Sequence, residues 1–191
     1  LSNFCKFMKK QFIHLSTGDL YGNNHDINRN VETSTDIDVG TTYRLSKYVA
    51  EKFCNPNDLI LRIRLPFDGR PHPKNLLVKI PKFTKVCCFV NDFTYVPDLV
   101  EATRILVEAK QCGIFNVIGH ESVSVLSLLK NVLQLPQFQY DDDAPYNPLI
   151  ISENNNLHMN NVSSDDKLRI FFKQTTLADA IKTSWNQLHS L

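Results

Sequence analysis

The sequence is poor in the features that build phosphate loops, metal centres and membrane spans. Its six glycines include no G-x-G-x-x-G or related run, so no glycine-rich loop for cradling a phosphate is recognisable. The six histidines show neither H-x-H nor i,i+4 spacing, and we predict no metal site. The longest apolar runs are far shorter than a membrane span, which excludes a transmembrane helix.

Charge and cysteine content narrow the class of protein further. A formal net charge of +1 gives no general field for attracting nucleic acid. The five cysteines include an adjacent pair, Cys87 and Cys88, but no C-x-x-C pair. Their odd number and the lack of a recognisable signal peptide favour reduced thiols. We therefore expect a soluble, cytoplasmic protein with no nucleic-acid partner and no membrane partner.

Helical and strand patterns alternate along the chain, which predicts an α/β fold with a parallel sheet and crossover helices. We predict helices over residues 2–10, 42–53, 97–110, 122–135 and 177–188, with a helical turn at 76–80. We predict strands over residues 11–17, 59–65, 86–90 and 114–117. The remaining segments, 22–41, the proline-broken stretch 66–81 and the Asn-, Asp- and Pro-rich stretch 137–164, are predicted to be mostly irregular.

Two short segments, His14–Gly22 and Thr42–Glu51, carry the chemistry of this sequence. The first is an apolar strand that ends in hydroxyl groups and a glycine, and the second opens a helix. Tyr43 and Lys47 lie four residues apart on that helix and therefore share a face. The Lys47 ammonium would favour loss of the Tyr43 phenol proton. Because Thr17 adds a second hydroxyl at the strand end, the set is suited to acid–base chemistry at a carbonyl.

These segments resemble the extended short-chain dehydrogenase/reductase family, whose active site combines a Ser or Thr with a Tyr-x-x-x-Lys pair. Segments Leu61–Phe67, Phe93–Ala102 and Gly113–Gly119 extend the resemblance over nearly the whole chain. The resemblance implies the C-terminal part of a Rossmann-like, doubly wound parallel sheet with a small C-terminal substrate lobe. Residues 1–191 would form one truncated unit, with about 1–68 and 86–120 in the Rossmann-like part and about 69–85 and 121–191 in the lobe.

The resemblance also implies a role for each candidate site residue. Thr17, or else Ser16, would polarise the carbonyl, Tyr43 would exchange the proton, and Lys47 would hold the nicotinamide ribose. The residues implied to bind NAD or NADP are Ser16, Tyr43, Lys47, Leu65, Pro66 and Phe67. The residues implied to bind substrate are Asp19, Arg64 and Asn75.

Arg62 and Arg64 alternate on one predicted strand and therefore face the same side. Two interpretations of that pair remain open from the sequence. The arginines form an exposed salt-bridge face, or they contact substrate or cofactor.

Within the family, the sequence is most similar to nucleotide-sugar epimerase/reductases of rhamnose-type synthesis, akin to dTDP-4-dehydrorhamnose reductase. Thr17-Gly18, in place of the Thr-Asp-Glu of 4,6-dehydratases, supports this, as do segments 61–66 and 73–80. We expect NAD(P)H-dependent reduction of a 4-keto-6-deoxy sugar nucleotide. A nucleotide-sugar 4,6-dehydratase or epimerase is an alternative, because Asp19 lies where the dehydratases place a glutamate.

The sequence departs from the family in lacking its glycine-rich first half. Family members begin with a strand, a glycine-rich turn and a helix that together hold the cofactor pyrophosphate. We therefore expect either a fragment or a shortened gene product that alone binds NADH and NADPH too weakly to detect. Self-association or a partner chain would cover Phe12, Ile13 and Leu15. A catalytically silent binding or regulatory subunit is the alternative from a different functional class.

Overall fold

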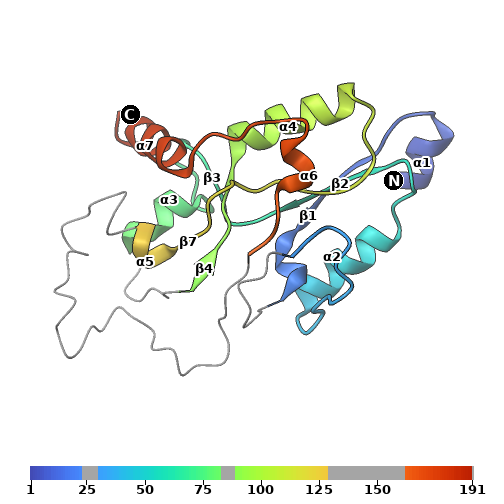
Figure 1. Ribbon diagram of the computed structural model, residues 1–191, viewed down its shortest axis with the longest axis horizontal. Coiled ribbons are helices and arrows are strands. Elements are labelled where there is room, and N and C mark those ends of the chain that lie inside the picture. The colour runs from blue at the N-terminus through green and yellow to red at the C-terminus, as the bar shows by residue number, and fades with distance from the viewer. Residues whose placement is uncertain (23–29, 83–88, 129–161, 191) are drawn as a thin grey trace.

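The computed structural model describes residues 1–22, 30–82, 89–128 and 162–190. Its centre is a three-stranded parallel sheet in the order β1-β2-β6 (Figure 1). The strands are β1 (Ile13–Thr17), β2 (Leu59–Ile63) and β6 (Gly113–Asn116). In the register of the sheet, β1 and β2 start together and end together, because Ile13 pairs with Leu59 and Thr17 with Ile63. The predicted α/β fold with a parallel sheet is confirmed.

Helices cover both faces of this sheet (Figure 1). On one face lies α2 (Thr42–Lys52), which starts where the Thr41 side chain accepts a hydrogen bond from the Arg44 N–H. On the other face lies α4 (Val96–Glu108), which opens with a proline in its first turn, a position that proline tolerates. The apolar face of α4 is buried against the side chains of β2 and β6. Both crossover helices agree with the prediction to within two residues.

A second apolar core lies beside the sheet, at the end where the strands finish. Its short strand β3 (Pro66–Phe67) pairs in parallel with β5 (Thr94–Tyr95). The helices that pack there are α3 (Leu76–Lys79), the 3₁₀ helix η2 (Ile80–Lys82), α5 (Val125–Ser127) and α7 (Leu177–His189). The buried residues of this core include Phe67, Leu77, Phe93, Leu128 and Ile181.

Several short elements differ from the sequence prediction. Helix α1 (Ser2–Phe7) ends before Lys9, whose backbone is left-handed at φ 55°. The helix predicted from Ser122 is wrong at its start, because β7 (Val123–Ser124) pairs there with β4 (Val90–Asn91). Helix α6 (Asp166–Arg169) was missed because four residues show no periodicity. The predicted structure at 86–88, 129–135 and 137–161 lies outside the described residues.

The described residues also bear on the membrane, metal and thiol predictions. No helix among them is long and apolar enough to cross a membrane, and they contain no cluster of His, Cys, Asp or Glu able to hold a metal. Cys5, Cys54 and Cys112 are free thiols. Burial raises the pKa of Cys54, which makes this thiol less reactive. Cys87 and Cys88 lie outside the described residues.

Strand β1 forms one edge of the sheet within the described part of the chain. Ile13 is 36% and Leu15 48% exposed, whereas Phe12 is half-buried. An apolar strand at a sheet edge offers unpaired backbone groups and a surface for association. That a second copy or a partner chain covers Phe12, Ile13 and Leu15 stays a prediction.

A buried ion pair fastens α2 to the sheet. Glu51 of α2 accepts hydrogen bonds from Arg62 Nε at 2.9 Å and from Arg62 Nη2 at 2.6 Å. The two side chains are only 5% and 3% exposed. The Ser16 hydroxyl donates to the same carboxylate at 2.5 Å, and the Tyr21 ring lies 4.9 Å from the guanidinium carbon. Arg62 is therefore neither an exposed salt bridge nor a free ligand, because α2 packs directly over it.

We expect Glu51→Gln to lower the free energy of unfolding by about 3–5 kcal/mol, because it leaves the Arg62 charge buried without its counter-charge. Urea denaturation measures this change. The control is Glu101→Gln, which removes a surface partner of Arg104 at 2.7 Å and should cost no more than about 1 kcal/mol. Equal losses in the two variants would show that the buried pair has no special role.

Candidate active site

The candidate site lies where β1 and β2 end side by side. The chain leaves β1 through the 3₁₀ helix η1 (Gly18–Tyr21), and it leaves β2 through Arg64 and Leu65. In parallel α/β sheets, ligands bind outside the carboxyl ends of the strands, where neighbouring chains diverge. This end of the sheet is therefore the place to look for catalytic groups.

Helix α2 presents Tyr43 and Lys47 on one face, one turn apart. The Lys47 ammonium donates a hydrogen bond to the Leu15 carbonyl of β1 at 3.0 Å. Tyr43 lies one turn earlier in α2, and its side chain is 54% exposed. The neighbouring Arg44 reaches Asp19, just beyond the end of β1. The start of α2 therefore lies beside the end of β1, with Tyr43 on the side where that strand finishes.

Thr17 occupies the last position of β1 and is 6% exposed. Its Oγ1 accepts a hydrogen bond from the Asp19 N–H at 3.1 Å, which caps η1. That bond uses an oxygen lone pair and leaves the hydroxyl hydrogen available for donation. The Ser16 hydroxyl, in contrast, donates to Glu51. Of these two buried hydroxyls, Ser16 thus has its acceptor inside the fold, and Thr17 is the candidate donor to a ligand.

Asp19 binds two arginines at once. Its carboxylate accepts from Arg44 Nε at 2.9 Å and from Arg64 Nη1 at 2.5 Å. Arg44 also pairs with Asp38, and Arg64 Nη2 donates to Asn91 Oδ1 at 3.1 Å. Burial favours a raised pKa for Asp19, but the hydrogen bonds and charges of the two arginines hold that pKa below its ordinary value. Asp19 is thus an ionised link between the start of α2 and the chain after β2.

A fully buried carboxyl lies near Arg64. Asp92 has 0% of its surface exposed. It accepts hydrogen bonds from the Ser122 hydroxyl at 2.6 Å and from the Ser163 N–H at 2.7 Å. Burial raises the pKa of Asp92 to about 6, although these bonds and the Arg64 charge act in the opposite direction. Asp92 thereby joins three segments that lie far apart in the sequence.

The raised pKa of Asp92 predicts a stability contribution that is lost as pH rises. The pKa of this carboxyl is 3.8 in the unfolded chain and about 6 in the folded one, so the folded state binds more protons between these values. Its contribution to the free energy of unfolding is therefore complete below pH 3.8 and is lost as the pH rises through 6. The difference corresponds to roughly 3 kcal/mol. We expect Asp92→Asn to gain stability relative to the parent by up to this amount between pH 4 and pH 7. Urea denaturation of both proteins at pH 4 and pH 7 measures this gain. The same stability difference between variant and parent at both pH values would contradict the prediction.

The chain bends sharply after β2, at the turn expected to face the nicotinamide. The predicted strand 59–65 ends at Ile63, because Leu65 has a φ of 38°, which an L-residue rarely adopts. The Thr94 hydroxyl holds the bend by accepting from the Arg64 N–H at 2.9 Å and donating to the Val117 carbonyl at 2.7 Å. Strained backbone of this kind is common at functional sites.

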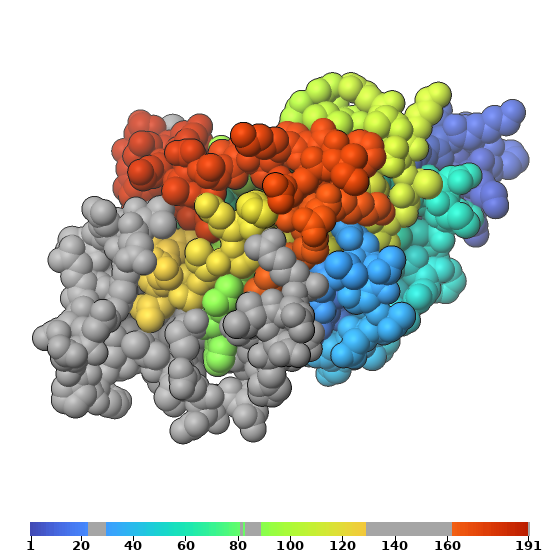
Figure 2. All heavy atoms as spheres, in the orientation of Figure 1, coloured from blue at the N-terminus to red at the C-terminus, as the bar shows by residue number. Residues whose placement is uncertain are grey.

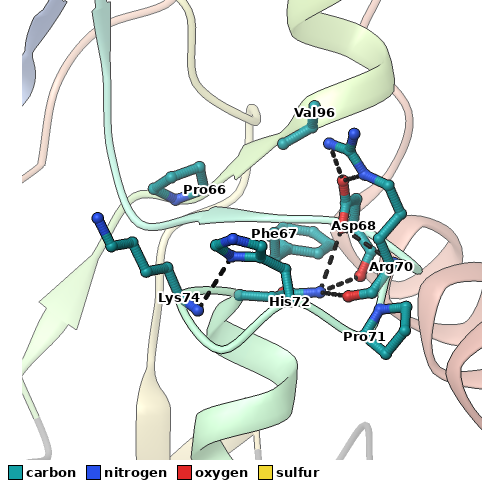
Figure 3. Close-up of a pocket in the computed structure, with 9 residues that line it drawn as sticks. Pro66, Phe67, Asp68, Arg70, Pro71, His72, Lys74 and Val96 are labelled. Carbon is teal, nitrogen blue, oxygen red and sulfur yellow. Dashed lines mark hydrogen bonds and ion pairs between the residues drawn. The ribbon is translucent and has the colours of Figure 1, made fainter.

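A cavity of about 650 Å³ opens beside this turn (Figure 3). The apolar part of its lining is Pro66, Phe67, Pro71 and Val96. The charged and polar part is Arg70, His72, Lys74 and Asp68, and Asp68 forms an ion pair with Arg70 at 2.5 Å. Asn75 also lines the cavity, but its amide donates to the Asp68 and Arg70 carbonyls at 2.8 Å each and caps α3 by accepting from the Leu77 N–H. The Asn75 side chain therefore shapes the cavity wall.

Comparison with known proteins finds solved structures with the same fold, although no protein-family model matches the chain. A structure of dTDP-4-dehydrorhamnose reductase from Bacillus anthracis, in complex with NADP, matches 96% of the chain with a TM-score of 0.76 and 15% identity. UDP-glucuronic acid 4-epimerase from Bacillus cereus, in complex with NAD, matches all of it with a TM-score of 0.68 and 20% identity. The chain has the fold of the extended short-chain dehydrogenases.

One viral protein matches in both sequence and structure. An uncharacterised protein of Acanthamoeba polyphaga mimivirus is 22% identical over 182 residues, which cover 90% of the chain and 62% of that protein. A UDP-rhamnose synthase structure from the same virus matches with a TM-score of 0.58 and 22% identity over 90% of the chain and 56% of its own length. The chain spans 66% of the Bacillus anthracis reductase and 64% of the epimerase. It therefore spans about two thirds of the length of these solved structures.

Sequence reasoning missed the residues that hold this dehydrogenase-like site together. Glu51 had a signal, because it follows Lys47 by one turn and so lies on the face that α2 turns to the sheet. Arg44 and Asp92 had none, because their partners come from distant segments of the chain. Only the folded chain shows those contacts.

Proposed function

We propose that the chain carries the acid–base and substrate-binding part of a nucleotide-sugar reductase/epimerase. The reaction would be NAD(P)H-dependent reduction of a 4-keto-6-deoxy sugar nucleotide in deoxysugar synthesis of the rhamnose type. The observation that carries the proposal is the placement of Tyr43 and Lys47 on one face of α2, beside the strand at whose end Thr17 keeps a free hydroxyl hydrogen.

In the proposed mechanism, the Thr17 and Tyr43 hydroxyls donate to the substrate carbonyl oxygen as negative charge develops on it. Tyr43 then gives up its proton, and the Lys47 ammonium, one turn away, stabilises the phenolate that remains. A bound nicotinamide cofactor supplies the hydride. Asp19 keeps Arg44 and Arg64 in place on either side of the strand end.

The described residues fit one end of such a cofactor. Lys47 and Tyr43 offer donors for the nicotinamide ribose, and the bend at Leu65, Pro66 and Phe67 offers an apolar wall for the ring. Lys47 would exchange the Leu15 carbonyl for the ribose hydroxyls when the cofactor binds. The Ser16 hydroxyl contributes indirectly in this proposal, because its hydrogen bond to Glu51 holds α2 against β1.

The cavity beside that bend is the proposed place of the nucleotide sugar. Lys74 brings a positive charge to a largely apolar hollow, and Arg70, which is paired with Asp68, and His72 add N–H donors. This composition suits a diphosphate attached to a base and a sugar. Arg64 would contact the substrate from the strand side, and Asn75 would act by keeping the wall in shape. The names of the Bacillus anthracis reductase and the mimivirus synthase support a nucleotide-sugar substrate.

The proposed division of the chain follows the two cores. The parallel sheet with α2 and α4 would form the Rossmann-like part, and the core around Phe67, Phe93 and Ile181 would form the substrate lobe. The exposed edge at Ile13 and Leu15 would be covered by a second copy or a partner chain.

Two observations favour a second candidate, a catalytically silent regulatory or structural subunit. The Lys47 ammonium is bound to the Leu15 carbonyl, and the sequence offers no glycine-rich phosphate loop. The dehydratase or epimerase alternative gains less from the structure, because Asp19 is held by two arginines and is poorly placed to act as an acid.

The test joins the chain to the glycine-rich, cofactor-binding half of a solved relative and supplies a 4-keto-6-deoxy sugar nucleotide with NADPH. Tyr43→Phe keeps the ring and removes the proton donor, so kcat should fall by about 10²-fold or more, with KM little changed. Lys47→Ala should weaken both cofactor binding and turnover. Parent-like turnover in Tyr43→Phe would reject the proposed acid.

The 191-residue chain alone provides the matched measurement. We expect no saturable binding of NADH or NADPH by calorimetry, because the described groups reach only the nicotinamide end of the cofactor. Tight binding by this chain would show that it holds a pyrophosphate site of a kind not recognised in its sequence.

A further inference from the structure

A second cavity, of about 690 Å³, lies at the opposite end of the sheet, where the strands begin. Three segments form it: the end of α1 with the approach to β1, the loop before β2, and the end of α4 with the approach to β6. In Figure 2 these segments meet at the right-hand end of the molecule in blue, teal and yellow-green. This cavity has no part in the function proposed above.

Four lysines line this cavity: Lys6, Lys9, Lys10 and Lys110. All four are exposed, and none forms an ion pair within the described part of the chain. The single carboxylate of the lining, Asp58, is 3% exposed. Asp58 accepts hydrogen bonds from the Ser2 hydroxyl and the Asn55 N–H, which hold its carboxylate inside the fold. Four exposed ammonium groups and one buried carboxylate give the cavity a net positive charge.

Two of these lysines occupy backbone positions that favour glycine. Lys9 has a φ of 55° and Lys110 a φ of 51°, and both follow the end of a helix. Glycine is the ordinary residue at such left-handed helix ends because a Cβ is disfavoured there. Lysine at both positions puts ammonium groups at the rim of one cavity in spite of that backbone preference.

Backbone and side-chain hydrogen bonds join the three segments that frame the cavity. The Gln11 amide donates to the Gln111 carbonyl at 2.7 Å and to the Asn57 carbonyl at 3.2 Å. The Gly113 N–H donates to the Asp58 carbonyl at 2.8 Å, and the Leu59 N–H donates to the Phe12 carbonyl at 3.0 Å. These hydrogen bonds between all three segments hold the backbone that carries the lysines in place without a ligand. Less conformational entropy is therefore lost on binding.

We propose that this cavity binds a compact phosphate polyanion, such as the triphosphate of a nucleoside triphosphate or a short inorganic polyphosphate. Several ammonium groups around one hollow match a ligand with several negative charges in a small volume. An extended nucleic acid needs a basic track along the surface instead, and the chain has a formal net charge of only +1. Val107 and Pro56 add an apolar rim against which a nucleobase can pack.

The test is isothermal titration of the 191-residue chain with inorganic tripolyphosphate at low salt. We expect saturable binding that weakens as salt rises, and about tenfold weaker binding in each of Lys9→Gly and Lys110→Gly. In both variants the thermal unfolding midpoint should stay the same or rise, because glycine adopts the left-handed conformation freely. The control Lys182→Ala, on α7 at the other end of the molecule, should leave the affinity unchanged.

Titration with ATP in place of tripolyphosphate distinguishes the two sources of the anion. Tighter binding of ATP, lost in the same two variants, would assign a nucleotide, and equal binding would assign the phosphate chain alone. The proposal is overturned if tripolyphosphate does not bind, or if Lys9→Gly and Lys110→Gly bind it as the parent does. It is also overturned if affinity for single-stranded oligonucleotides exceeds that for tripolyphosphate and grows with their length. None of these outcomes depends on the catalytic proposal.

Discussion

The buried pair between Glu51 and Arg62 is the interaction on which the candidate site depends. Removing two charges from water is costly, and a buried pair offsets that cost only with good geometry and further hydrogen bonds. Here the carboxylate accepts two bonds from the guanidinium and a third from Ser16, and the Tyr21 ring lies over the cation. Because Glu51 is two turns along α2 from Tyr43, fixing Glu51 also fixes the helix face that carries Tyr43 and Lys47.

A second charged network attaches the start of the same helix to the chain beyond the sheet. Asp19 joins Arg44, beside Tyr43, to Arg64, beyond the end of β2. Helix α2 is thus held to the sheet at both ends, once by a buried pair and once by a half-buried one. Lys47 lies between these two attachments and Tyr43 lies directly before the first of them, which limits how far both side chains can shift relative to Thr17.

The sequence was sufficient for the elements with long, regular patterns. Helices α2, α4 and α7 show the helical period over eleven or more residues, and the apolar runs of β2 and β6 lie between them. The short elements could not be predicted in the same way. Strand β7 has two residues and helix α6 has four, so neither contains a full period, and both are stabilised by partners from distant parts of the chain.

In the candidate site, too, the features set by local geometry could be predicted from the sequence, and those set by tertiary contacts could not. The spacing of Tyr43 and Lys47 and the hydroxyls at the end of β1 were visible in the sequence because they depend on local geometry. Whether Arg62 was exposed could not be predicted, because strand alternation gives the side that a residue faces but not what covers that side. The raised pKa of Asp92 also follows from tertiary burial, of which its neighbours in sequence carry no sign.

Amide hydrogen exchange in the parent and in Glu51→Gln tests the central claim most directly, namely that the buried pair holds α2 against β1. The account predicts that amides of residues 45–52 exchange at least about tenfold faster in the variant, because local opening of α2 becomes easier. Amides of α4, on the opposite face, serve as the internal reference and should change little. Unchanged protection of α2 in Glu51→Gln would contradict the account.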